Sequence, residues 1–167
     1  MSRERLLDQA KQQTHLKNNA RPMREGDAIA GRYRLEKLLG RGASGSTWRA
    51  QDLETGEMVV VKALELRRLK DWKDVELFER EAKVLKNLSH ERIPRYVDYF
   101  QLELERGPLF VLVQQYIPGT NLQEKVKAGW RGTEEEIKAI GVRILRILSY
   151  IHSLRPAIIH RDINPRN

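Results

Sequence analysis

The sequence contains no cysteine, which excludes disulfide-linked scaffolds, cysteine-ligated zinc sites and catalytic thiols. Four histidines are scattered along the chain: His15, His90, His152 and His160. They lack the close spacing of a zinc site, which argues against a metal held by imidazole. The chain also lacks an uncharged run of membrane-spanning length, and it opens on charged residues where a signal peptide needs an apolar stretch. We therefore expect a soluble, cytoplasmic protein with no membrane segment in this chain.

The composition is that of a folded protein of about one domain. Of the 167 residues, 40% are hydrophobic and 32% are charged, which is too apolar for a disordered chain. Lys and Arg number 31 against 23 Asp and Glu, giving a net charge of +8. Because the two signs are interspersed, we interpret this charge as a solvated surface. A basic nucleic-acid-binding protein is the alternative, but no residue pattern predicts base reading, and we expect no specific nucleic-acid partner.

Two parts of the chain differ in character. Residues 1–26 are polar and basic, and they predict a flexible tail. Beyond them, alternating and β-branched segments predict five antiparallel strands, at 33–38, 46–51, 58–64, 96–103 and 109–116. A helix is expected at 71–88, where Val75, Phe78, Ala82 and Leu85 share one face. The fold class is therefore α+β.

The last third of the chain predicts helices. A short helix is expected at 121–128 and a long one at 133–153, where Thr133 and Glu136 form a capping box. The apolar residues of the long helix cover about half of its circumference, more than the stripe of a surface helix. We therefore expect a partner surface that covers helix 133–153.

The segment 40–45 reads Gly-Arg-Gly-Ala-Ser-Gly, a pattern that binds phosphates in several folds. An ordinary hairpin turn is the alternative, because glycine supplies positive φ. A dinucleotide fold would place a helix after the glycines, whereas here they lie between two strands. This arrangement favours a loop that closes over nucleotide phosphates.

Lys62 ends the apolar strand 58–64, and Glu81 lies on the following helix beside the inward-facing Phe78 and Ala82. In isolation, a lysine in this position is more often a surface residue at the edge of a strand. An unpaired carboxylate near a core is costly, and a Lys62–Glu81 ion pair would satisfy both groups. Glu79 is the rival carboxylate, although its direction is more outward.

The chain ends in His160-Arg161-Asp162-Ile163-Asn164-Pro165-Arg166-Asn167, after a short apolar strand expected at 157–159. A capped turn, in which Asp162 and Asn164 bond local backbone, is one interpretation. It does not explain why this segment follows the glycine pattern, Lys62 and Glu81 in this order. Together, these motifs make residues 31–167 resemble the first part of a protein kinase domain of the bacterial, eukaryotic-like (Hanks-type) Ser/Thr class.

The resemblance implies a two-lobed fold, with an ATP-binding N-lobe at 27–117 and the start of a helical C-lobe at 118–167. It implies that ATP and Mg²⁺ are the cofactors, and that the γ-phosphoryl group passes to Ser or Thr hydroxyls of a protein substrate. The implied nucleotide-binding residues are Gly40, Gly42 and Gly45 over the phosphates, Thr47 and Val60 at the adenine, Lys62 at the phosphates, the backbone of Gln115 and Ile117 at the adenine edge, and Asn121 at the ribose. Gln114 falls at the gatekeeper position.

The implied catalytic residues are Lys62 and Glu81 as the ion pair, Asp162 as the base that accepts the hydroxyl proton, and Asn167 as a magnesium ligand. Asn164 stands where Ser/Thr kinases usually carry a lysine, a cation near the transferred group. Losing one such contact commonly costs about 10²–10³ in rate, so we expect Asn164→Lys to raise turnover in a complete kinase domain.

Neither Asp-Phe-Gly nor Ala-Pro-Glu occurs in the 167 residues. Because the family uses the first for a magnesium ligand, we expect a chain truncated after the catalytic loop to be poorly active or inactive alone. A non-catalytic, pseudokinase-like interaction module is the alternative function.

Overall fold

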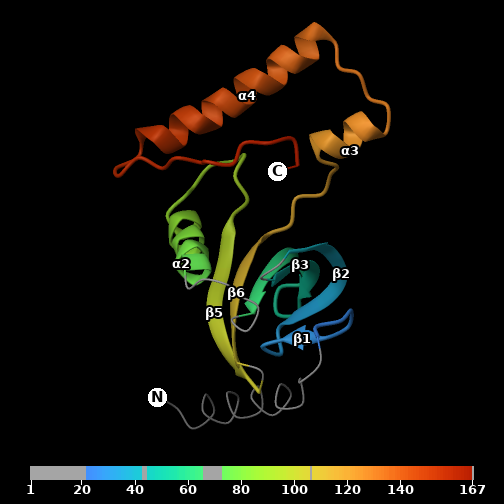
Figure 1. Ribbon diagram of the computed structural model, residues 1–167, viewed down its shortest axis with the longest axis vertical. Helices are drawn as coiled ribbons and strands as arrows, with labels where there is room; N and C mark the ends of the chain where they lie inside the picture. Colours follow the sequence, from blue (N-terminus) through green and yellow to red (C-terminus); the bar gives the residue numbers. More distant parts are fainter. Residues whose placement is uncertain (1–21, 43–44, 66–72, 106, 167) are drawn as a thin grey trace. The chain divides into compact units, whose positions relative to one another are not determined.

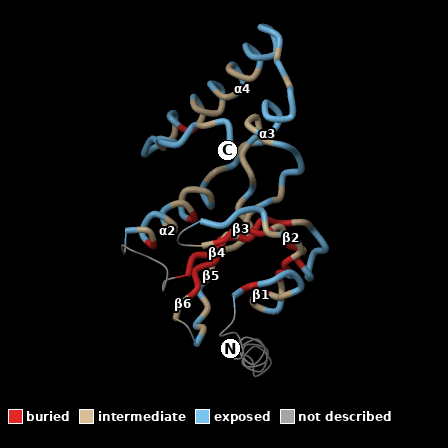
Figure 2. The backbone as a smooth tube through the Cα atoms, turned by 45° about the vertical axis from the view of Figure 1, so that its right-hand side comes forward, coloured by how far each residue is buried: buried red, intermediate tan, exposed pale blue. Residues whose placement is uncertain are grey.

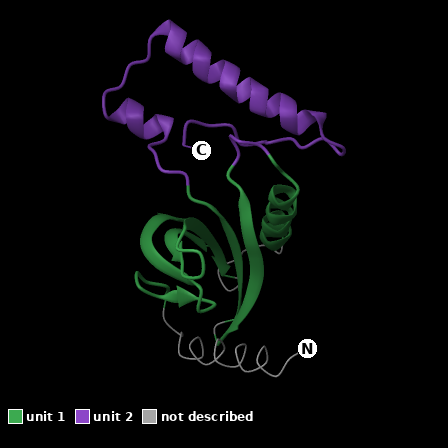
Figure 3. Ribbon diagram, turned by 180° about the vertical axis from the view of Figure 1, so that it is seen from behind, with its two compact units in different colours: residues 1–89, 94–116 green, residues 90–93, 117–167 purple. Residues whose placement is uncertain are grey.

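The computed structural model describes residues 22–42, 45–65, 73–105 and 107–166 (Figure 1). They form two compact units (Figure 3). Unit 1 contains the residues up to 89 together with 94–116, and unit 2 contains 90–93 and the residues from 117 onward. Most of the tail expected at 1–26 lies outside the described residues.

Unit 1 is built on a curled antiparallel sheet with the strand order β1-β2-β3-β4-β6-β5 (Figure 1). Its strands are β1 (Ala28–Ile29), β2 (Tyr33–Arg41), β3 (Gly45–Asp52), β4 (Met58–Glu65), β5 (Tyr96–Leu104) and β6 (Gly107–Gln115). The five expected strands are present, and the described residues form a sixth, β1, which pairs with the start of β2. Two residues are too few to show an alternating pattern, so the count of five was one too low.

The strand sequences explain which faces are buried. In β3, Ser46, Trp48, Ala50 and Asp52 are buried while the residues between them are partly exposed, as expected for a period of two. The central strands β4 and β6 are buried on both faces over much of their length, as Figure 2 shows. The main core lies on one face and includes Trp48, Val61 and Val113.

Helix α2 (Lys73–Lys86) covers part of the other face of the sheet. Val75 and Ala82 are buried on the face expected from the sequence, and Val75 packs with Leu64 and Phe110 of the sheet. Acidic residues in the first turn and lysines in the last turn suit the helix dipole. Residues 71 and 72 of the expected helix lie outside the described residues.

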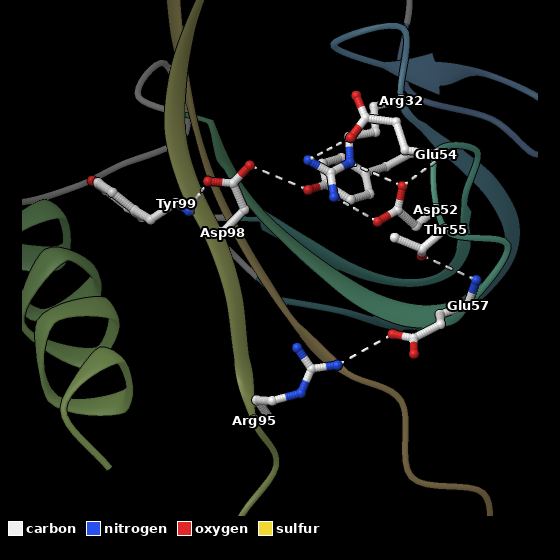
Figure 4. A network of polar contacts seen from close by, with 9 residues as sticks. Arg32, Asp52, Glu54, Thr55, Glu57, Arg95, Asp98 and Tyr99 are labelled. Atoms are coloured by element: carbon white, nitrogen blue, oxygen red, sulfur yellow. Dashed lines mark hydrogen bonds and ion pairs between the residues drawn. The ribbon is translucent and has the colours of Figure 1, made fainter. Parts of the chain in front are cut away.

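A polar network ties the turn between β1 and β2 to the hairpin between β3 and β4 (Figure 4). Arg32 donates two hydrogen bonds to the Asp52 carboxylate, at 2.9 and 2.7 Å, and pairs with Glu54 at 3.1 Å. The hydrogen bond from Arg32 lowers the pKa of the buried Asp52 carboxyl to about 2. Nearby, the Tyr33 hydroxyl donates to Asp98 at 3.2 Å, and burial raises the pKa of Tyr33.

Unit 2 contains α3 (Leu122–Lys127) and α4 (Glu134–Ser153). The capping box of Thr133 and Glu136 is present, which confirms that prediction. Ile151 is the only buried residue of α4, whereas Ile137 and Leu145 are 57% and 64% exposed. No described helix has the length and apolarity needed to cross a membrane.

The strand expected at 157–159 is wrong. These residues have no regular structure in the described chain, and Ile158 N instead donates to Ile151 O at 3.0 Å. A strand needs a ladder partner, and the apolar run alone does not provide one. The α+β class expected from the sequence is confirmed by the sheet and the three described helices.

Candidate functional site

The glycine-rich segment connects β2 to β3. The turn is shorter than the expected 40–45, because β2 continues through Gly40 to Arg41. Gly42 N donates to Gly45 O at 2.9 Å and closes the turn, while residues 43 and 44 lie outside the described residues.

The three glycines differ in what requires them. A Cβ at Gly45 would lie 2.1 Å from the Ala63 carbonyl oxygen, so close packing against β4 excludes any side chain there. A Cβ at Gly40 or Gly42 would meet open space. Packing among the described residues therefore does not explain why these two positions lack side chains, and close approach of a ligand to the backbone is a reason that fits.

Lys62 lies on β4, opposite Thr47 of β3 and Leu112 of β6. Its Nζ atom is 2.5 Å from Oε1 of Glu81 on α2, so the expected ion pair is present and joins the helix to the sheet. The carboxylate paired with Lys62 is that of Glu81 and not that of its rival, Glu79. The Lys62 and Glu81 side chains are 31% and 42% exposed, so the ammonium is held in one place yet accessible to a ligand.

Beside this pair, the same face carries the residues implied for adenine. Val60 is buried and lies two residues before Lys62, opposite Gln114. The backbone N–H of Gln115 already donates to Arg95 O at 2.8 Å, so a backbone contact from Gln115 to a ligand has to use the backbone carbonyl. The neighbouring Ile117 is exposed and belongs to unit 2.

Asn121, implied at the ribose, is the N-cap of α3. Its Oδ1 atom accepts a hydrogen bond from Glu124 N at 2.9 Å, which satisfies one of the free amides of the first turn. The side-chain carbonyl of Asn121 is therefore occupied by the helix, and its NH₂ group is the part of the side chain that can donate to a ligand.

Residues 160–166 form a loop without regular structure that is held by side chains. Asp162 N donates to His160 Nδ1 at 3.4 Å, and Asn164 Nδ2 donates to Asp162 Oδ1 at 2.9 Å. Arg161 has a φ of 65°, a left-handed conformation that is costly for a non-glycine residue and turns the chain just before Asp162. Asp162 is exposed.

Two further bonds in this loop could not be expected from the motif itself. Asn164 Oδ1 accepts from Arg166 N at 2.9 Å, and Gln123 N of α3 donates to Pro165 O at 3.0 Å. The first agrees with the alternative interpretation of a capped turn, which therefore coexists with the motif. The second joins the loop to the first turn of α3.

The structure brings the site residues together in two groups. Gly45, Thr47, Val60, Lys62 and Glu81 lie in unit 1, and Asn121, Asp162 and Asn164 lie in unit 2. Asn167 lies outside the described residues.

The residues present suit a nucleotide better than they define a metal centre. A fixed, accessible ammonium and a glycine-rich turn match the charge and bulk of phosphates. Asp162 offers the hard oxygen donors that Mg²⁺ prefers, but the described residues contain no group of three or more carboxylates or histidines placed to hold a metal ion.

Comparison with known proteins identifies the family. The model of the protein kinase domain matches residues 33–167. The chain is 40% identical over 145 residues to the serine/threonine-protein kinase B of Synechocystis, covering 83% of this chain and 24% of that protein. It is 34% identical over 142 residues to the serine/threonine-protein kinase pkn3 of Myxococcus xanthus, covering 85% and 25%. The same identity relates it to the serine/threonine-protein kinase tousled-like 2 of Xenopus tropicalis, covering 81% and 20%.

The chain thus spans about a quarter of the length of the two bacterial relatives named above. Its sheet with α2 fits a kinase N-lobe, and α3, α4 and the 160–166 loop fit part of a C-lobe. On the strength of the family match and of this fold, the chain belongs to the protein kinase family, among the Ser/Thr kinases.

Proposed function

We propose that this chain provides the ATP-binding lobe and the catalytic loop of an enzyme that transfers the γ-phosphoryl group of ATP to Ser or Thr hydroxyls of proteins. The observation that carries the proposal is the Lys62–Glu81 ion pair, at 2.5 Å across β4 and α2. Phosphoryl transfer depends mainly on positioning and on charge stabilisation, and a lysine fixed by a carboxylate supplies both for the α- and β-phosphates.

The other residues have roles consistent with this chemistry. The turn at Gly42 and Gly45 covers the phosphates with backbone, and Thr47 and Val60 enclose the adenine. Asp162 accepts the proton of the substrate hydroxyl, and the amide of Asn164 orients its carboxylate through the 2.9 Å hydrogen bond. Mg²⁺, when bound, neutralises phosphate charge, and Asn167 is the residue that we assign to it.

The ion pair is tested in the full-length protein by Glu81→Gln, with Glu79→Gln on the same helix as the matched control. We expect Glu81→Gln to lower kcat/KM for ATP about 10²-fold, because a misplaced lysine loses the phosphates. It should also reduce the thermal shift produced by Mg·ATP. Glu79→Gln should change either quantity by less than about twofold. Equal effects of the two variants would refute the assignment of Glu81.

Activity of the 167-residue chain alone is a separate question. Because the sequence contains no Asp-Phe-Gly, we infer that this stretch alone retains nucleotide binding and has little or no transfer activity. A comparison of its Mg·ATP thermal shift and its turnover with those of the full-length protein tests this inference.

A non-catalytic module is the second candidate function, and Asn164 favours it. This residue places a neutral amide beside Asp162, where Ser/Thr kinases usually carry a cation. In that case the full-length protein would bind Mg·ATP without transferring phosphate, and the exposed apolar side chains of α4 would bind a protein partner. Phosphorylation of any Ser or Thr peptide in an Asp162-dependent manner excludes this candidate.

A further inference from the structure

A single carboxamide links Asp162 to Arg166. Asn164 Nδ2 donates to Asp162 Oδ1, and Asn164 Oδ1 accepts from Arg166 N, both at 2.9 Å. Two hydrogen bonds and one amide group span at most about 8 Å. The backbone of Arg166 is therefore fixed within that distance of the carboxylate that we propose as the base.

The side chain of Arg166 is available to a substrate. Arg166 is exposed, and within the described part of the chain its guanidinium has no ion-pair partner. The hydrogen bond from Gln123 N to Pro165 O holds the preceding residue against α3, so two hydrogen bonds anchor the backbone that leads into Arg166.

The charge of the loop is basic. Between 157 and 166, Asp162 is the only acid, and Arg161 and Arg166 lie on either side of it. Glu124 is the one acidic residue of the neighbouring α3, and no ion pair joins it to Arg166 among the described residues. A peptide whose hydroxyl reaches Asp162 thus meets an exposed guanidinium on an anchored backbone, and a guanidinium binds carboxylates with a planar pair of donors.

We propose that Arg166 determines substrate specificity by favouring acceptor peptides that carry an Asp or Glu near the phosphorylated Ser or Thr. The inference rests on the proposed kinase function of the same loop. An extended peptide advances about 3.3 Å per residue, so the selected carboxylate lies within about three residues of the hydroxyl.

The test uses the full-length protein and a set of peptides with one central Ser in an Ala and Gly background. One Glu is placed in turn at each position from three before the Ser to three after it, and a matched set carries Gln at the same positions. We expect one Glu peptide to have a kcat/KM roughly tenfold above that of its Gln counterpart, as for a hydrogen bond to a charged group. Arg166→Gln should bring this ratio to about one. Arg166→Glu should instead favour a peptide that carries Lys at the same position.

Arg143→Gln, at an exposed position of α4, is the matched control and should leave the ratio unchanged. A reversal of preference in Arg166→Glu is a result that a purely structural role of Arg166 does not produce. The specificity proposal is overturned if Glu and Gln peptides react equally, or if the ratio survives both Arg166 variants. In either case phosphorylation of the Gln peptides leaves the kinase function intact.

Binding separates the two proposals when transfer is absent. Fluorescence anisotropy with labelled peptides in which Ala replaces the Ser measures the same Glu-to-Gln ratio without catalysis. A Glu preference that follows the charge at position 166 supports the specificity proposal even where the kinase proposal fails. Equal binding of all peptides overturns it.

Discussion

At the scale of single residues, Asn164 is the position where this loop departs most from Ser/Thr kinases. Its amide donates to Asp162 and accepts from Arg166 N, so it positions the carboxylate but adds no charge near the transferred phosphoryl group. A lysine would lose the bond to Arg166 N and gain a full positive charge. Because a positive charge at this position stabilises the transition state more than the ground state, we expect Asn164→Lys to increase turnover despite the lost hydrogen bond.

The measured outcome is kcat of the full-length protein with saturating Mg·ATP and a Ser peptide. We expect Asn164→Lys to raise kcat by roughly tenfold or more. Asn164→Leu should lower kcat, because leucine neither holds the Asp162 carboxylate nor carries a positive charge. An unchanged or lower kcat in Asn164→Lys contradicts this account of Asn164.

At the scale of elements, the Arg32–Asp52 pair joins the β1–β2 turn to the β3–β4 hairpin, as Figure 4 shows. The hairpin is further held by Leu53 N, which donates to Arg32 O at 2.9 Å. Hydrogen bonding to Arg32 lowers the pKa of Asp52 from 3.8 to about 2, so the folded state favours the charged carboxylate. Its contribution to stability is complete above about pH 4 and is lost as the pH falls toward 2.

We therefore expect Asp52→Asn to lower the free energy of unfolding by on the order of 1–2 kcal/mol at pH 7, and by much less at pH 2. Urea denaturation between pH 2 and 5 measures the difference. Glu57→Gln is the control in the same hairpin, because its ion pair with Arg95 at 3.2 Å is exposed on both sides and should matter little. A pH-independent difference between wild type and Asp52→Asn rules out titration of Asp52 as the cause.

At the scale of the whole molecule, the sequence predicts those features that depend on local patterns. The five longer strands, the inward face of α2, the Lys62–Glu81 pair and the capping box of α4 all follow from residue spacing. Strand β1 and the irregular 157–159 segment were predicted wrongly, because β1 is too short to show a period and an apolar run forms a strand only where a pairing partner is present. The cap at Asn121 and the bridge through Asn164 depend on the backbone geometry of loops, which residue types alone do not specify.

Burial is distributed unevenly between the two units, and this predicts which helices and strands exchange their backbone amides with solvent more quickly. Strands β4 and β6 carry most of the fully buried side chains, whereas α4 buries only Ile151 among its 20 residues (Figure 2). A good cap and high helix propensity stabilise a helix by a few kcal/mol at most, so packing decides its protection.

In the 167-residue chain, we expect amides of α4 to exchange with solvent at least about a hundredfold faster than those of β4 and β6. Hydrogen exchange followed by mass spectrometry measures this, with α2 as an internal reference because it packs on the sheet through Val75 and Ala82. Protection of α4 equal to that of β4 would contradict the expectation.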